Sequence, residues 1–207
     1  MSKMKALLRA GVIAGAAMAL SACVSVFPKQ QPATMFRFGY TTPPAAAAAG
    51  APSFGVIRAV TSFDRAASAE RILTVDGGEA AYIRGSRWVS SASVLFDEAV
   101  TRAFDGAGGP ARLIGRGEVV RADYVLKLDV RSFEARYDHG AKAAPTVVVV
   151  VHADLDRVND RAAVGSRTFS IEIPASDNRV SAIAAAFDQG VTKVLGDLVQ
   201  WVDNRGA

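Results

Sequence analysis

The sequence predicts an α+β protein, a two-layer sandwich in which a mostly antiparallel sheet carries two long amphipathic helices on one face. Apolar and polar residues alternate with a period of two in several segments, as in half-buried strands. Two other segments change to helical spacing, and the order along the chain is strands, helix, strands, helix. The chain has 207 residues, of which half are hydrophobic, enough for one domain with a sizeable core.

The first group of strands is expected between residues 35 and 85. "MFRFGY", from Met35 to Tyr40, alternates and is rich in aromatic residues, and "SFGVIRAVTSF" over 53–63 is a second candidate. The segments "ERILTV" and "AAYIRG" flank "DGGE", whose Asp-Gly pair favours a tight hairpin turn.

Two helices are expected, one after each group of strands. Residues 88–104 change to helical period, and "DGAGGP" ends that helix. A longer helix follows "ASDN" at 175–178. Its apolar stripe predicts that it lies along the sheet, and the stripe consists of Val180, Ile183, Ala184, Phe187, Val191, Val194, Leu195, Leu198 and Val202.

The second group of strands contains a break in alternation. In "YVLKLDVRSFEARY" the apolar phase passes from Leu126, Leu128 and Val130 to a set that includes Phe133 and Tyr137. A period-2 pattern slips in this way through a bulge or an exchange of faces. Either the slip is a bend in the sheet, or it turns Phe133 and Tyr137 toward a partner. We take these two residues as candidate partner contacts.

The run of five valines in "TVVVVVHADL" also has two interpretations. It predicts a central strand buried on both faces. Alternatively, it is an exposed apolar strand used by a partner or a lipid. In "SRTFSIEIP", which follows after a turn, Phe169, Ile171 and Ile173 share one face.

The N-terminus has the pattern of a secretory leader. Lys3, Lys5 and Arg9 precede an uncharged apolar run that ends at Ala22, which is shorter than a membrane span. These three residues belong to the 24 basic ones, so without residues 1–22 the chain has 21 basic and 20 acidic residues. The net charge of +4 therefore comes mostly from the leader. No basic stripe remains that would predict a nucleic-acid partner.

The tetrapeptide Leu20, Ser21, Ala22, Cys23 resembles the lipobox of bacterial lipoproteins. In that motif the cysteine thiol accepts a diacylglyceryl group, and cleavage before the cysteine frees an amine for a further acyl chain such as palmitate. Two chains give stable membrane anchoring. The alternative is a free cysteine buried in the core. Val24 follows the cysteine where aspartate would retain a lipoprotein at the inner membrane, which favours the periplasmic side of the outer membrane.

These patterns divide the chain into three parts. Residues 1–22 are the expected signal peptide and 23–34 a lipidated tether. Residues 35–207 are one domain with a Pro/Ala-rich loop at 41–52. The mature chain would have no cysteine besides Cys23, which suits an oxidising compartment.

The sequence offers no motif for catalysis or for a metal. The phosphate-binding, nucleophile-elbow and zinc-protease motifs do not occur. His139 lies in a predicted turn, and His152 shares the polar side of a strand with Asp154 and Asp156. We interpret both histidines as surface residues. We therefore expect no enzyme activity, no catalytic residues, no metal and no cofactor apart from the lipid on Cys23.

Several short segments, together with Cys23, resemble the ABC-type transport auxiliary lipoproteins, which include the PqiC-type lipoprotein. They cover most of the mature chain and are "MFRFGY", "VIRAV", "FDR" at 63–65, "RILTV", the pair Arg87-Trp88 expected to open a helix, "YVLKLDVRSFEA" and the terminal helix ending in "LVQW".

The resemblance implies a non-catalytic component of an intermembrane lipid transport system. Its partners would be an MCE-domain protein, which it docks or caps, and an ABC permease with its ATPase. A homo-oligomeric ring is also implied. The alternative is a structural or assembly lipoprotein that supports an outer-membrane protein or a secretion complex.

Overall fold

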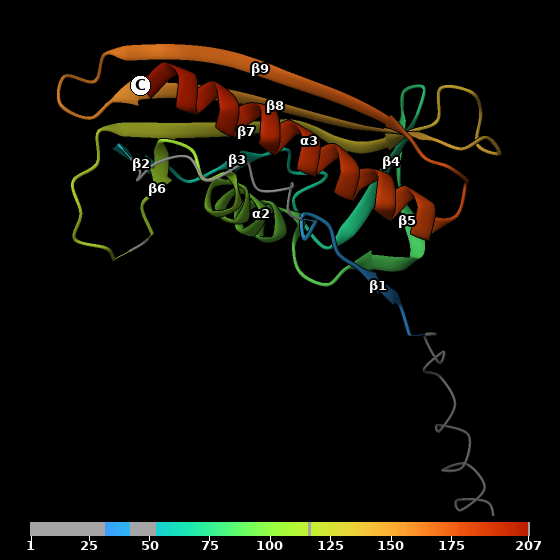
Figure 1. Ribbon diagram of the computed structural model, residues 1–207. Coiled ribbons are helices and arrows are strands. Elements are labelled where there is room, and N and C mark those ends of the chain that lie inside the picture. Colours follow the sequence, from blue (N-terminus) through green and yellow to red (C-terminus); the bar gives the residue numbers. More distant parts are fainter. Residues whose placement is uncertain (1–31, 42–52, 116, 207) are drawn as a thin grey trace, which may run out of the picture. The chain divides into compact units, whose positions relative to one another are not determined.

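The computed structural model describes residues 32–41, 53–115 and 117–206, and within these residues the chain forms one sheet and two helices (Figure 1). The strands are β1 (Thr34–Phe36), β2 (Phe54–Arg58), β3 (Ser62–Phe63), β4 (Arg71–Asp76), β5 (Glu79–Trp88), β6 (Ala111–Leu113), β7 (Tyr124–Arg136), β8 (Thr146–Arg157) and β9 (Ala163–Pro174). The helices are α2 (Ala92–Ala107) and α3 (Val180–Gly206).

Strand β7 organises the sheet. On one edge it continues into the antiparallel meander β7–β8–β9. On its other edge β2, β3 and β4 pair with it one after another, each parallel to it. Beyond these, β6 pairs with β2, and the β4–β5 hairpin carries β1 at its far edge. The long strand pairs are antiparallel, so the predicted fold class is confirmed.

Both helices pack on one face of this sheet. An aromatic cluster joins the layers: the ring of Phe133 in β7 lies 4.7 Å from that of Phe187 in α3, and Phe63 in β3 lies 5.9 Å from Phe96 in α2. The cluster also contains Phe38 and Trp88, both 1% exposed. Its rings meet mostly edge to face or tilted, the arrangements that favour aromatic pairs.

The predicted slip in the alternation is a β-bulge at Arg131. Val130 pairs with Val151 and Ser132 with Val150, so Arg131 has no opposite residue. The bulge carries Phe133 and Ala135 to the same buried face as Leu126, Leu128 and Val130. The prediction of a central valine strand is confirmed as well, because β8 lies between β7 and β9 and buries Val148 on one face and Val147, Val149 and Val151 on the other.

Three predicted boundaries differ from the structure. The first strand ends at Phe36 instead of Tyr40, and the segment 53–63 is two strands separated by the exposed Val60. Trp88 ends β5 instead of opening a helix. α2 begins at Ala92 after Ser91, and the left-handed Gly108 ends it.

Candidate functional site

The predicted lipidation site lies outside the described residues. This holds for Cys23 and for Leu20, Ser21 and Ala22 of the lipobox, because the described chain begins at Pro32. The last three residues of the predicted tether are described, and the last of them, Thr34, already belongs to β1. Among the described helices, none is both long and apolar enough to cross a bilayer.

The structure corrects the prediction that Phe133 contacts a partner. Its side chain is 1% exposed and touches four other aromatic rings in the core. The alternation of β7 correctly placed Phe133 on an apolar face. The bulge, however, restores that face to the helix side of the sheet, so the residue packs inside the domain.

Tyr137 is half-buried at the end of β7. Its hydroxyl donates a hydrogen bond to Oδ1 of Asn178 at 2.7 Å, which joins the end of β7 to the segment before α3. Burial raises the pKa of this phenol above its ordinary value. Contact between Tyr137 and a partner stays a prediction.

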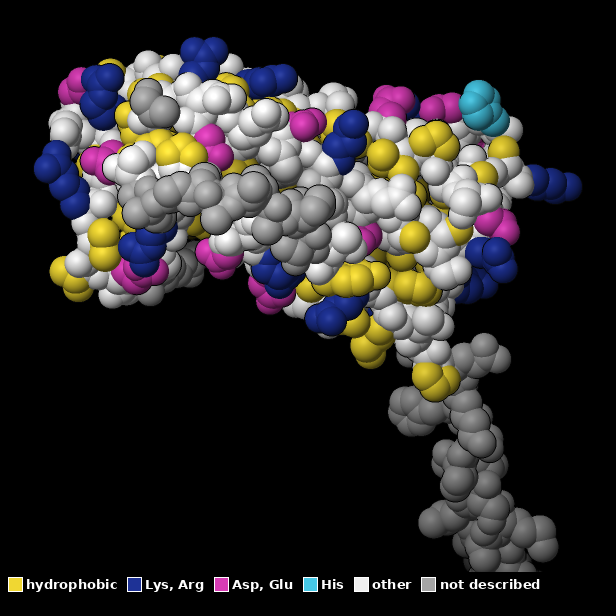
Figure 2. All heavy atoms as spheres, in the orientation of Figure 1, with side chains coloured by type: hydrophobic (Ala, Val, Ile, Leu, Met, Phe, Trp, Pro, Cys, Tyr) yellow, Lys and Arg dark blue, Asp and Glu magenta, His cyan; other side chains and the backbone are white. Residues whose placement is uncertain are grey.

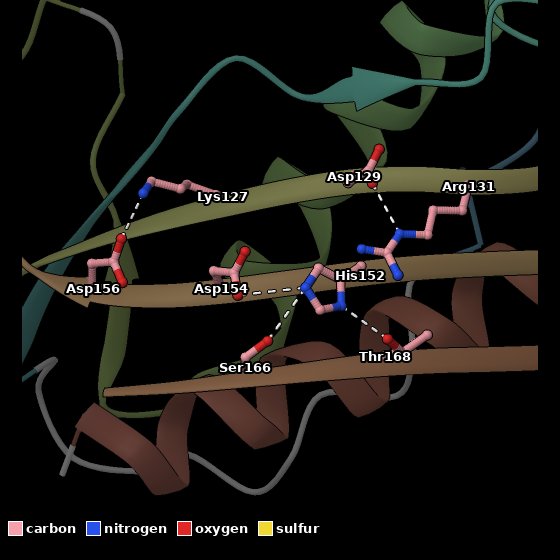
Figure 3. Close-up of polar contacts among 8 residues, drawn as sticks. All are labelled: Lys127, Asp129, Arg131, His152, Asp154, Asp156, Ser166 and Thr168. Atoms are coloured by element: carbon pink, nitrogen blue, oxygen red, sulfur yellow. Dashed lines mark hydrogen bonds and ion pairs between the residues drawn. The ribbon is translucent and has the colours of Figure 1, made fainter. Parts of the chain in front are cut away.

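The face of β7–β8–β9 that points away from the helices is polar apart from Val148 and Val150 (Figure 3). Its charges form local pairs: Lys127 Nζ lies 2.7 Å from Asp156, and Arg131 Nε lies 2.9 Å from Asp129. Because these ion pairs lie at the surface, where water and salt screen them, they contribute little to the stability of the fold. They give the face a mixed charge pattern.

His152 lies in the middle of this polar face, as the sequence predicts. Its Nδ1 is 2.8 Å from Thr168 Oγ1, and its Nε2 is 3.3 Å from Ser166 Oγ and 3.5 Å from Asp154. A hydrolytic triad needs the nucleophile and the acid on opposite ring nitrogens. Ser166 and Asp154 instead approach the same nitrogen, so they do not form a Ser-His-Asp triad with His152, and the hydroxyl on the other nitrogen belongs to Thr168.

Metal binding has no support in the part of the chain that the structure describes. No cluster of three or more His, Cys, Asp or Glu side chains there could hold an ion.

A buried carboxylate that the sequence analysis missed connects the start of the domain to the last helix. Asp188 of α3 is 8% exposed. Its Oδ1 accepts a hydrogen bond from the Gly39 amide at 2.7 Å, and its Oδ2 accepts one from the Thr41 hydroxyl at 2.6 Å. A buried carboxylate needs such donors, so the segment that follows β1 is held against α3.

Helix α2 binds the same segment from its other side. Nε of Arg102 donates a hydrogen bond to the Gly39 carbonyl at 2.9 Å. Gly39 has φ of +69°, and a Cβ atom there would lie 2.4 Å from the Cβ of Ala99. Only glycine therefore fits between the helices. We call Gly39, Thr41, Arg102 and Asp188 the Asp188 clasp.

One feature of the sequence could have indicated the clasp. Asp188 follows Phe187 and precedes Val191 by three residues, so it lies on the apolar stripe of α3. An acid on a stripe that packs against a sheet needs hydrogen-bond donors. The sequence alone does not identify those donors, because they are almost 150 residues away in the chain.

Comparison with known families agrees with this architecture. The profile of the family described as "ABC-type transport auxiliary lipoprotein component" matches residues 39–199, which includes Gly39, Thr41, Arg102 and Asp188. The chain belongs to this family. No curated protein is significantly similar to it.

Solved structures share the fold. Protein XCC0632 from Xanthomonas campestris, of the family DUF330, is 30% identical, with a TM-score of 0.74 over 84% of this chain and 97% of that one. The hypothetical protein CT253 from Chlamydia trachomatis is 10% identical, with a TM-score of 0.54 over 74% of this chain and 97% of that one.

Proposed function

We propose that this protein is a lipoprotein anchored to the periplasmic side of the outer membrane. There it would serve as a non-catalytic auxiliary component of an ABC transporter that moves lipids between membranes, docking or capping an MCE-domain protein. The observation that carries this proposal is the match of the transport auxiliary family to residues 39–199. The lipobox residues at 20–23 support the anchor.

The length of the tether supports a role close to the membrane. Nine peptide units separate Cys23 from Pro32, so the described domain begins at most roughly 32 Å from the lipidated residue. The Asp188 clasp then fastens the chain to both helices within the next nine residues. A domain attached in this way would stay close to the bilayer, where it could meet a transport protein that spans the periplasm.

The description of the family as a transport auxiliary component supports a non-catalytic role, and His152 is not part of a Ser-His-Asp triad. The histidine bonds to neighbouring side chains on an open sheet face, and the orientation required for a Ser-His-Asp triad is not met. The proposed activity is therefore binding and positioning of a partner.

The anchor is tested by membrane fractionation of cells that express the full chain or its Cys23→Ala variant. We expect the unmodified protein in the outer membrane, with two kinds of acyl modification on Cys23 by mass spectrometry. The variant should leave the outer-membrane fraction and fail to restore the transport defect of a deletion strain. Full complementation by the variant would contradict a required anchor.

The choice of partner separates the proposal from its alternative. Affinity purification that recovers mainly an outer-membrane β-barrel or a secretion complex would favour the structural or assembly role.

A further inference from the structure

A group of exposed side chains lies where the described chain begins. Met35 is 54% exposed, Tyr40 55% and Val89 46%. Single exposed apolar residues are common on protein surfaces, but a group of them in one place is informative. Arg37 and Arg87 lie among them. We call Met35, Arg37, Tyr40, Arg87 and Val89 the tether-proximal surface. Figure 2 shows hydrophobic side chains, with basic ones next to them, beside this end of the chain.

The pairing of β1 with β5 places these side chains on one face. Met35 pairs with Arg87 and Phe36 with Trp88 in a parallel register, and the amide of Val89 donates a hydrogen bond to the Phe36 carbonyl at 2.8 Å. Because Phe36 and Trp88 point to the core, the alternating residues on either side of them point outward. The guanidinium of Arg37 lies 5.9 Å from the centre of the Tyr40 ring, which adds Tyr40 to the group.

The chemistry of this surface matches a phospholipid interface. Tyrosine is enriched at the headgroup level of membranes, and arginine is both a bidentate phosphate ligand and able to extend toward water. Methionine and valine supply apolar area. The acid that pairs with this group is Glu70, whose Oε2 lies 3.3 Å from Nη1 of Arg87, and both side chains are about half exposed. That exposed pair is weak and easily exchanged for a phosphate.

The position of the surface specifies which lipid it would meet. Met35 follows Cys23 by twelve residues, so the chain length restricts it to within roughly 40 Å of the acylated residue. Of the described strands and helices, β1 is the nearest in sequence to Cys23.

We propose that the tether-proximal surface lies on the phospholipid bilayer that holds the acyl chains of Cys23. Met35 and Val89 enter the boundary between headgroups and acyl chains, and Arg37 and Arg87 bind lipid phosphates. This contact rests on the proposed anchor at Cys23. The domain is then attached to the membrane at two points, the acyl chains and this surface. Two attachments fix the orientation of the domain, which the acyl chains alone do not do.

The experiment uses the full, lipidated chain with one added cysteine at Met35→Cys or Val89→Cys. The sulfur of Cys23 is a thioether once acylated, so an environment-sensitive fluorophore labels only the added cysteine. The protein is reconstituted in vesicles of phosphatidylethanolamine and phosphatidylglycerol, with or without lipids that carry a nitroxide quencher at a shallow depth. Asn159→Cys is the control, because this exposed residue lies in the β8–β9 turn at the opposite end of the sheet (Figure 1).

We expect a blue shift of emission and strong quenching by the nitroxide lipids at positions 35 and 89, and neither at position 159. Protein that floats with the vesicles while both probes stay unquenched would overturn the membrane contact and leave the anchor intact. Probes that are shielded from a water-soluble quencher and insensitive to nitroxide lipids would identify a protein–protein interface and overturn the proposal. Failure of the protein to float with vesicles would overturn the anchor and this contact together.

Discussion

At the scale of single residues, Gly39 carries a requirement that side-chain contacts alone do not reveal. Gly39→Ala combines an unfavourable φ of +69° with a close approach to Ala99, whereas Gly85 has the same φ and open space around it. The left-handed conformation costs about 1–2 kcal/mol for a residue with a Cβ atom. We expect Gly85→Ala to lower the free energy of unfolding by that amount. Gly39→Ala should lower it by about 1–3 kcal/mol more, because it also overpacks the helix contact.

Urea denaturation of both variants measures this difference. Equal losses at positions 39 and 85 would show that the segment moves away from α2 without a penalty.

Phe133 and Tyr137 should respond differently to substitution. Phe133→Ala removes a ring that is buried among four others, so we expect it to lower the free energy of unfolding by about 3–5 kcal/mol. Tyr137→Phe removes the hydroxyl that binds Asn178 and should cost only about 1 kcal/mol. Thermal and chemical denaturation test both values. A loss below about 1 kcal/mol for Phe133→Ala would contradict its burial and favour the alternative in which Phe133 contacts a partner.

Two aspartates should give opposite pH dependence of stability. Burial raises the pKa of Asp203. The hydrogen bond that Oδ1 of Asp203 accepts from the Ala111 amide at 3.0 Å lowers this pKa, but by less. The folded state therefore binds this proton more tightly than the unfolded state. The stabilisation that comes from protonated Asp203 is fully present below the ordinary aspartate pKa, and it is lost as the pH rises through the raised pKa. Asp203→Asn, which keeps an acceptor oxygen, should be more stable than the natural protein at neutral pH but not in acid.

Asp160 is the matched control for that prediction. A hydrogen bond from the Ala162 amide and one from Arg157 lower the pKa of Asp160. Its contribution to stability is present above the ordinary pKa and is lost as the pH falls through the lowered value. Asp160→Asn should therefore be less stable than the natural protein at neutral pH and equal to it in strong acid. Denaturation curves across this pH range would contradict the assignment if the two variants shifted in the same direction.

At the scale of elements, the periodicity of apolar residues predicted the features that depend on neighbouring residues in the sequence. It identified the strands of the meander, the two helices and the slip in β7, because each produces its own spacing of apolar residues. It missed the end of β1 and the division of residues 53–63, because Phe38 and Val60 continue the alternation in sequence while the chain leaves the sheet. Pairing partners decided those boundaries, and partners distant in sequence leave no periodic pattern.

The segment from β1 to Thr41 is held in part by one side chain of α3. Asp188→Ala removes the acceptor of the Gly39 amide, and hydrogen bonds to charged groups contribute about 1.5–3 kcal/mol. The same free energy corresponds to amide exchange at Gly39 that is roughly ten- to hundredfold faster in the variant. Asp188→Asn keeps one acceptor and should have a smaller effect.

Hydrogen exchange measured by mass spectrometry on peptides covering 33–41 tests this prediction, with β8 as the internal reference. Unchanged protection at Gly39 in Asp188→Ala would show that Arg102 and the packing of Phe38 hold the segment without the carboxylate.

At the scale of the whole molecule, the sequence predicted the fold class and the family more fully than the surface. Burial follows from patterns that repeat along the chain, so eight of the nine residues predicted for the core stripe of α3 are buried, although the buried face also includes Val199 and Trp201. The proposed membrane surface combines Met35 and Arg37 with Val89, and they meet only through the pairing of β1 with β5, which no repeat in the sequence indicates. Phe133 was assigned to a partner surface because alternation identifies an apolar face but not which side of the sheet the helices cover.

The central proposal rests on the family: this domain belongs to a lipoprotein that assists an ABC transport system by binding a partner. The most direct measurement is chemical crosslinking in intact cells, followed by affinity purification of the full chain and identification of the crosslinked proteins. We predict an MCE-domain protein as the main partner, recovered together with an ABC permease and its ATPase, and lost in the Cys23→Ala variant. Recovery of an outer-membrane barrel or a secretion complex in place of these proteins would contradict the account.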